Sequence, residues 1–328
     1  MTALPNSPAS GSDAPAPPAP RGFWRRVRHH LAELALTLPS CGWMIVFFLI
    51  PSVLLFTLSF HPTATDGGIG EGWTLETWRT LANPDYPSIV WRTIWLSLVS
   101  TLICIVISVP CAFAMSRAPA IRRHVLVGLV ILPFWTSFLI RVFAWKILLH
   151  PDGVIRGFLL SLSIIRPDQQ LLYNPVAVLL VMVYTYLPFA VLPLYAAAEK
   201  FDFNLIEAAL DLGATPLRAF SSVFVPGIRA GIFSATLMVL IPAFGSYVIP
   251  DMVGGANSEM VGSKIAQRAI PDRNLPHASA LSALLMLGVL APPFLGWVVL
   301  RRRNIGVTES EAVAEAGDSG VVQKGGVS

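Results

Sequence analysis

The chain has 328 residues, of which 54% are hydrophobic and only 13% are charged, and its mean hydropathy is +0.65. This composition excludes an ordinary soluble protein. The isoelectric point of about 9.1 does not indicate a nucleic-acid partner, because the basic residues are scattered between apolar segments. Cys41, Cys104 and Cys111 show no metal-ligand or disulfide spacing, and they are interpreted as small apolar residues.

Residues 1–40 are predicted to form a disordered, basic segment, because they are rich in Pro and Ala and carry a group of arginines before the first apolar run. That run, 41–60, is as long as a full membrane span. A cleaved signal peptide is the alternative, but no small-x-small cleavage site follows the run promptly. The sequence therefore predicts an uncleaved first span, interrupted at Pro51.

Six separated apolar runs predict an all-α integral membrane protein with six transmembrane helices. The runs lie at about 41–60, 93–115, 125–149, 175–197, 228–250 and 278–300. They define a transmembrane domain over 41–300. The tail 301–328 is acidic and contains many Gly and Ala residues, so it is predicted to be disordered.

The distribution of Lys and Arg predicts the orientation of these helices. With six spans, the N-terminal segment, 116–124, 198–227 and the tail share one side of the membrane. That side carries fourteen Lys and Arg residues, against seven on the other side. Because cytoplasmic segments carry the excess of positive charge, both termini and segment 198–227 are predicted to be cytoplasmic.

The polar segment 198–227 contains the signals for two short helices. Asn204 is placed to N-cap the first helix, and Glu207 follows three residues later, at the position of a capping-box carboxylate. Gly213 is placed to end this helix with a positive φ angle. Thr215 and Pro216 are typical of the N-cap and first residue of a second helix.

The first of these helices is apolar on two sides. One stripe consists of Leu205, Ala208, Ala209 and Leu212, and the other of Phe203, Ile206 and Leu210. Glu207 and Asp211 are like charges at i and i+4, which costs about 0.2–0.5 kcal/mol unless a cation comes from elsewhere. Since a solvated helix needs only one apolar stripe, this helix is predicted to dock into a cleft of a partner.

The same segment resembles the EAA loop of permeases of ATP-binding cassette (ABC) importers, whose pattern is E-A-A-x3-G-x9-I-x-L-P. The chain departs from it only by Val223 and Val225 in place of Ile and Leu. The resemblance implies the type I ABC importer permease fold and a coupling helix that docks on a cytoplasmic ATPase. A plain capping box without partner contact is the alternative for Glu207. The candidate coupling residues are Glu207, Ala208, Ala209, Asp211, Gly213 and Pro226.

The resemblance also implies the partners: an ABC ATPase dimer, a second permease subunit in a heterodimer, and an external solute-binding protein, assembled in a bacterial inner membrane. The chain contains no G-x-x-x-x-G-K-[ST] phosphate loop and no hydrolase motif, so it is predicted to be neither an enzyme nor a cofactor-binding protein. An ion-driven transporter and an intramembrane enzyme are the alternatives. Inverted repeats between the two halves would favour the ion-driven transporter, and the intramembrane enzyme lacks a candidate nucleophile.

Two further segments, 133–145 and 242–255, are similar to segments of spermidine/putrescine permeases, which implies a polyamine substrate. A polycation needs aromatic faces, carboxylates or carbonyls along its path. The candidate path residues are Trp135, Arg141, Tyr184, Tyr186, Tyr247 and Asp251. Arg141 has two interpretations, a structural ion pair or a lining residue. Another small organic solute, or an anion attracted by Arg141, is the alternative substrate.

Overall fold

The computed structural model describes residues 37–64, 67–83, 85–166 and 168–290. These residues divide into two compact units, Met1–Leu54 and Leu55–Ser328, which are described separately. The described residues are helical, with a single isolated antiparallel bridge between Thr63 and Ile69. The predicted segment 1–40 lies outside the described residues up to position 36, and so does the whole predicted tail 301–328.

The first unit contains one apolar helix, Thr37–Leu58, which continues past the unit boundary. A π-helical stretch, η1 (Ile45–Leu49), leads into α2 (Ile50–Leu58). The prediction that Pro51 interrupts this helix is wrong. Pro51 lies inside a continuous helix, two residues after the end of a widened turn that fits a residue without an N–H donor. The helix is apolar all round and exposed, as expected for a surface that faces lipid.

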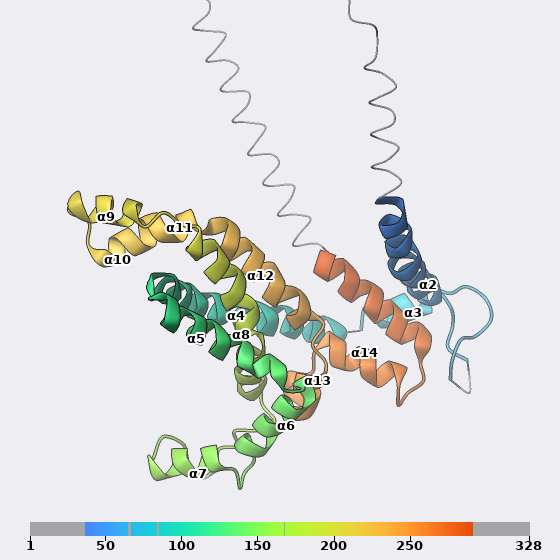
Figure 1. Cartoon of the computed structure of the whole chain (residues 1–328). Helices are drawn as coiled ribbons and strands as arrows, with labels where there is room; N and C mark the ends of the chain where they lie inside the picture. Colours follow the sequence, from blue (N-terminus) through green and yellow to red (C-terminus); the bar gives the residue numbers. More distant parts are fainter. Residues whose placement is uncertain (1–36, 65–66, 84, 167, 291–328) are drawn as a thin grey trace, which may run out of the picture. The chain divides into compact units, whose positions relative to one another are not determined.

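Three long helices form the core of the second unit: α4 (Asp85–Arg117), α8 (Pro175–Glu199) and α12 (Arg229–Phe244). They lie side by side (Figure 1), and each contacts the other two. The centre of the core lies along α8, where Val178, Val181 and Met182 have no exposed surface. α4 extends beyond the run expected at 93–115, because its first two turns are amphipathic and do not register as an apolar run.

The interface of α4 is rich in small hydroxyl residues. Thr93, Ser97 and Thr101 are buried, and the hydroxyl groups of Thr93 and Thr101 donate to carbonyl oxygens four residues earlier in the same helix. Thr93 Oγ1 also accepts a hydrogen bond from the N–H of Val261 at 2.8 Å. Small side chains let membrane helices approach closely, and the hydroxyls of Thr93 and Thr101 are satisfied within the protein.

The segment expected as one helix over 125–149 is divided. α5 (Ala120–Ile131) continues as the 3₁₀ helix η2 (Leu132–Trp135), and α6 (Phe138–Leu149) starts after a break and leads to α7 (Val154–Ser161). The two halves meet at 90°. Pro133 has no N–H donor, Thr136 is in an extended conformation, and Ser137 is not helical, so the helix does not continue through 136–137.

The segment expected as a helix over 228–250 is also divided. α12 ends at Phe244, and the short α13 (Val248–Val253) begins after Gly245, Ser246 and Tyr247. The helix α3 (Glu76–Thr80), the 3₁₀ turn η4 (Ala256–Ser258) and α14 (Val261–Ala269) lie in the connecting segments. An apolar helix spans Leu275–Leu290, and residues 291–300 of the expected sixth span lie outside the described residues.

Within the described residues, three helices are long and apolar enough to cross a membrane, and there are up to five candidate spans if each bent pair counts as one. The bent pairs are Ala120–Trp135 with Phe138–Ser161, and Pro216–Gly227 with Arg229–Phe244. The fold is therefore that of an all-helical membrane protein with at least three apolar spans.

Candidate functional site

Phe203 occupies the N-cap position of helix α9 (Asn204–Asp211), and the polar acceptor for the first helical N–H comes from the residue before it. Oδ1 of Asp202 accepts a hydrogen bond from the N–H of Asn204 at 3.0 Å. The prediction that Asn204 is the N-cap is therefore wrong, because Asp202 already supplies the acceptor and Asn204 is the first helical residue. Glu207 lies exposed in the first turn, and its carboxylate forms no hydrogen bond or ion pair with another residue that the structure describes.

The end of α9 is set by Gly213, whose φ angle is +86°. Its N–H donates to the carbonyl of Leu210 at 2.9 Å, and the N–H of Ala214 donates to the carbonyl of Ala209 at 3.0 Å. These two bonds form a Schellman motif, which requires a left-handed residue at this position. The predicted positive φ at Gly213 is confirmed.

The second part of the segment also follows its local signals. Oγ1 of Thr215 accepts a hydrogen bond from the N–H of Arg218, and α10 (Pro216–Ala219) starts at the proline. The chain continues through the π-helical η3 (Phe220–Phe224) to α11 (Val225–Gly227), which contains Pro226. α12 then leaves at 71°. Because a Cβ on Gly227 would overlap the ring of Phe201, glycine permits the close approach at this bend.

Five phenylalanine rings hold the inner side of α9. This phenylalanine cluster consists of Phe113, Phe201, Phe203, Phe220 and Phe224. Phe224 has no exposed surface, and its ring centroid lies 4.9 Å from that of Phe113 and 5.3 Å from that of Phe201. The Arg117 guanidinium lies 5.5 Å from the centre of the Phe113 ring. The cluster joins the start of α9 to the end of α4 through ring contacts.

The two apolar sides predicted for α9 have different environments. Ile206 is 5% exposed and packs with the phenylalanine cluster, and Ala209 is partly buried beside it. On the other side, Leu205 is 52% exposed and Leu212 is 89% exposed, and Leu217 of α10 is 78% exposed. Ala208, Glu207 and Asp211 are exposed as well. Leu205, Glu207, Ala208, Asp211, Leu212 and Leu217 together form an outer face of apolar and acidic residues.

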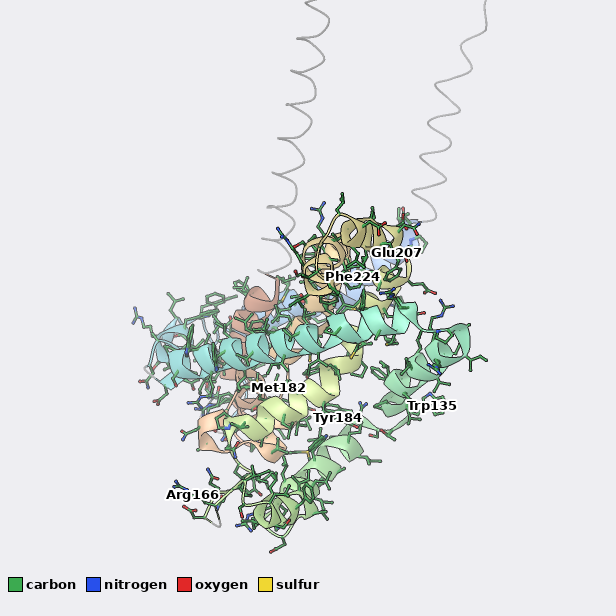
Figure 2. The ribbon with its side chains drawn as sticks, turned by 90° about the vertical axis from the view of Figure 1, so that its left-hand side faces the viewer. Trp135, Arg166, Met182, Tyr184, Glu207 and Phe224 are labelled. Carbon is green, nitrogen blue, oxygen red and sulfur yellow. The ribbon has the colours of Figure 1, made fainter. Side chains whose placement is uncertain are left out.

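This outer face lies at one end of the helical core. Figure 2 shows Glu207 and Phe224 at one end and Arg166 at the opposite end, with Met182 and Tyr184 of α8 between them. α8 alone has 25 residues, which span about 38 Å as a helix. That length exceeds the hydrocarbon thickness of a bilayer, so the two ends of α8 lie on opposite sides of a membrane.

The structure gives Arg141 a defined partner. Its Nη1 donates to the carbonyl oxygen of Pro133 at 2.7 Å, and its guanidinium lies 5.8 Å from the centre of the Phe134 ring. In the part of the chain that the structure describes, Arg141 has no carboxylate partner, so these residues do not support the ion-pair interpretation. Arg141 instead braces the break between α5 and α6, because the same Pro133 carbonyl also accepts hydrogen bonds from the N–H and the Oγ1 of Thr136 at the end of η2.

The three other candidates from the middle of the chain differ in position. Trp135 is 82% exposed at the end of η2. Tyr184 lies against Trp145 in an edge-to-face contact at 5.3 Å and lines an apolar cavity of about 370 Å³ between α4, α5 and α8. Tyr186 is only 6% exposed, and its hydroxyl donates to the carbonyl of Pro242 at 3.2 Å. Tyr186 therefore ties α8 to α12 inside the core, and its predicted lining role does not fit this position.

Tyr247 and Asp251 do share a cavity, of about 430 Å³, between α13, η4 and α14. Glu259 lines the same cavity and adds a second carboxylate, which the sequence analysis missed. The signal for it was the pair Gly254 and Gly255 between the two acids, because glycines allow the chain to fold back. A Cβ on Gly254 would overlap the carbonyl of Pro250, which shows how tightly this turn packs.

A second, more polar cavity of about 340 Å³ lies beside the first and shares Glu259 with it. Its other charged residues are Asp85, Arg92, Lys264 and Arg268. Burial opposes the charged form of Arg268, but its hydrogen bonds to Tyr86 and Asp272 outweigh this and raise the pKa of the guanidinium. The described residues include no cluster of His, Cys, Asp and Glu that could hold a metal ion.

Comparison with known proteins agrees with the resemblance of the EAA loop. The spermidine/putrescine transport system permease protein PotB of Haemophilus influenzae is 38% identical over 241 residues, which cover 74% of this chain and 84% of that protein. The chain belongs to this family of polyamine-type ABC permeases. No family model matches the chain.

Solved structures support the fold. The chain is similar to a bacterial ABC transporter involved in the import of the acidic polysaccharide alginate, with a TM-score of 0.65 and 17% identity over 85% of this chain and 98% of that chain. The same transporter type, in complex with alginate pentasaccharide-bound periplasmic protein, matches with a TM-score of 0.62 and 16% identity over 82% and 93% of the two chains. At this identity the similarity shows the fold alone, which is that of ABC importer permeases.

Proposed function

We propose that the chain is the permease subunit of an ATP-driven importer of polyamines such as putrescine and spermidine. The observation that carries this proposal is the 38% identity to a spermidine/putrescine permease over most of both chains. The cavity that joins Tyr247, Asp251 and Glu259 supports it, because carboxylates and aromatic faces are the groups that replace water around ammonium ions. The chain itself carries out no bond chemistry.

The partners follow from the outer face of α9. Apolar side chains beside two carboxylates suit a cleft in the ATPase dimer, which hydrolyses ATP for the assembly. A second permease subunit covers the remaining lipid-exposed helices, and an external binding protein delivers the substrate. ATP binding moves the ATPases, α9 follows, and the phenylalanine cluster transmits this motion to α4. The membrane segments then alternate between openings on the two sides.

The proposed topology has six spans with both termini and α9–α11 in the cytoplasm of a bacterial cell, and the assembly lies in its inner membrane. In this topology each bent pair is one span, and Leu275–Leu290 is the described part of the sixth. The excess of Lys and Arg on the side of α9 supports the orientation. The candidate coupling residues, Glu207, Ala208, Ala209, Asp211, Gly213 and Pro226, are then placed where ATP is available.

Reporter fusions test this topology. Fusions after residues 120 and 215 are expected to report a cytoplasmic position, and fusions near residues 75, 160 and 265 an external one. Alkaline phosphatase and green fluorescent protein fusions give opposite signals on the two sides, so each site is measured twice. A cytoplasmic signal at 265 would contradict the six-span arrangement.

Uptake of labelled putrescine and spermidine tests the substrate. Cells that lack the gene are expected to lose ATP-dependent polyamine uptake, and a plasmid copy is expected to restore it. Uptake of an unrelated amino acid through another importer is the control for general damage to the membrane. If polyamine uptake is unchanged and uptake of an anionic solute is lost, the polyamine substrate is rejected and the assignment as an importer permease stands.

A further inference from the structure

Glu259 lies between the two cavities of the α13–α14 region. On one side it shares a cavity with Tyr247 and Asp251, and on the other side with Arg92 and Lys264. Its carboxylate is therefore accessible to a cation from the first cavity and to the side chain of Lys264 from the second. Of the acidic residues in the described part of the chain, only Glu259 lines both cavities.

Lys264 already engages this carboxylate. Its Nζ lies 3.7 Å from Oε2 of Glu259 and donates a hydrogen bond to Oε1 of Gln267 at 2.9 Å. The Lys264 side chain is 19% exposed and that of Glu259 is 40% exposed, so the pair is partly screened by water. The end of the lysine side chain is a primary ammonium on a four-carbon chain, which is the same chemical group as the end of putrescine.

A polyamine that enters the first cavity meets Asp251 and the Tyr247 ring directly, and it meets Glu259 only if it replaces Lys264. The replacement exchanges one ammonium for another, so its net energy is small. Lys264 keeps its bond to Gln267 and lines a cavity that contains Asp85, so the displaced ammonium is not left without a carboxylate nearby. The exchange is therefore reversible.

We propose that Glu259, with Asp251 and Tyr247, forms a subsite for the ammonium groups of a polyamine, and that Lys264 is a tethered competitor that keeps this subsite weak. This inference rests on the proposed polyamine import. A site on a transport path has to bind its substrate tightly enough to be occupied and weakly enough to release it. When Lys264 returns to Glu259, it lowers the affinity of the subsite and promotes release of the substrate.

Binding of spermidine to the assembled transporter in lipid nanodiscs, without the binding protein, tests the inference. Lys264→Gln is expected to tighten spermidine binding about 2- to 5-fold, the range of a partly exposed ion pair. Glu259→Gln is expected to weaken it at least about threefold. The double variant is expected to match Glu259→Gln alone, because Lys264 acts only through Glu259. Lys264→Arg keeps the cation, and Arg166→Gln removes an external cation that lines neither cavity, so both are expected to bind as wild type.

Transport provides the second readout. With saturating spermidine-loaded binding protein, Lys264→Gln is expected to lower the maximal rate of uptake, because release becomes slower. If wild type imports spermidine but Lys264→Gln binds it with unchanged or lower affinity, the inference is overturned and the proposed function stands. If wild type imports no polyamine, the proposed function itself fails. Equal amounts of each variant in the membrane exclude a folding defect as the cause.

Discussion

Glu207→Lys is expected to abolish ATP-driven uptake while the chain remains inserted in the membrane. Glu207 is exposed in the first turn of α9, and its carboxylate forms no hydrogen bond or ion pair with another described residue. The substitution creates an opposite pair with Asp211 at i and i+4, which offsets part of the loss of a carboxylate from the first turn, and each effect is about 1 kcal/mol or less. A loss of uptake in a chain that remains inserted is therefore attributed to a lost partner contact and not to loss of the helix.

The measurement is uptake together with the amount of ATPase that copurifies with the permease. Glu207→Lys is expected to reduce uptake to background. It is also expected to lower the amount of bound ATPase or to uncouple ATP hydrolysis from transport, because reversing a charge in a contact that excludes water costs several kcal/mol. Glu71→Lys reverses an exposed carboxylate in the segment before α3 and is the matched control, with uptake expected as in wild type. Normal uptake in Glu207→Lys would show that Glu207 is an ordinary first-turn carboxylate without a partner contact.

The local geometry of the α9–α11 segment could be predicted from the sequence because it depends on neighbouring residues. The left-handed Gly213 and the start of α10 at Thr215 and Pro216 follow from capping chemistry alone. The N-cap was misplaced by one residue, because the N-cap is Phe203 and the side chain of Asp202 accepts from the N–H of Asn204, which a pattern of capping residues does not reveal. Which apolar stripe of α9 is buried depends on Phe113 and Phe224, which are far away in the sequence.

The breaks in the membrane segments could not be placed from hydropathy. A hydropathy window adds up apolar residues and gives the same value for a straight helix and for two helices at 90°. Pro133 and Gly245 mark the two breaks, but Pro188 and Pro193 lie inside the continuous α8, so proline alone does not decide. Glu259 was missed for a related reason, since only the fold brings it beside Asp251.

Gly231→Ala is expected to destabilise the permease by about 1–3 kcal/mol, the usual effect of overpacking in a close contact. Gly231 is buried on α12, and a Cβ placed on it would overlap the Cβ of Ala197 on α8. Helix backbones that touch through two small residues have no side chain that can rotate away. To make room for the added methyl group, α12 would have to move away from α8, and the contact between these two helices would be weakened.

The contact offers a rescue that separates this steric effect from a general loss of glycine. Ala197→Gly removes the opposing methyl group, so the pair Gly231→Ala with Ala197→Gly is expected to regain most of the thermal stability and uptake lost in Gly231→Ala alone. Gly128→Ala on α5 adds a methyl group where no atom lies within 4 Å, and its melting temperature in detergent is expected to equal or exceed that of wild type, because Ala favours the helix over Gly. If Gly231→Ala melts as wild type, or if Ala197→Gly brings no recovery, α8 and α12 do not pack through these two residues.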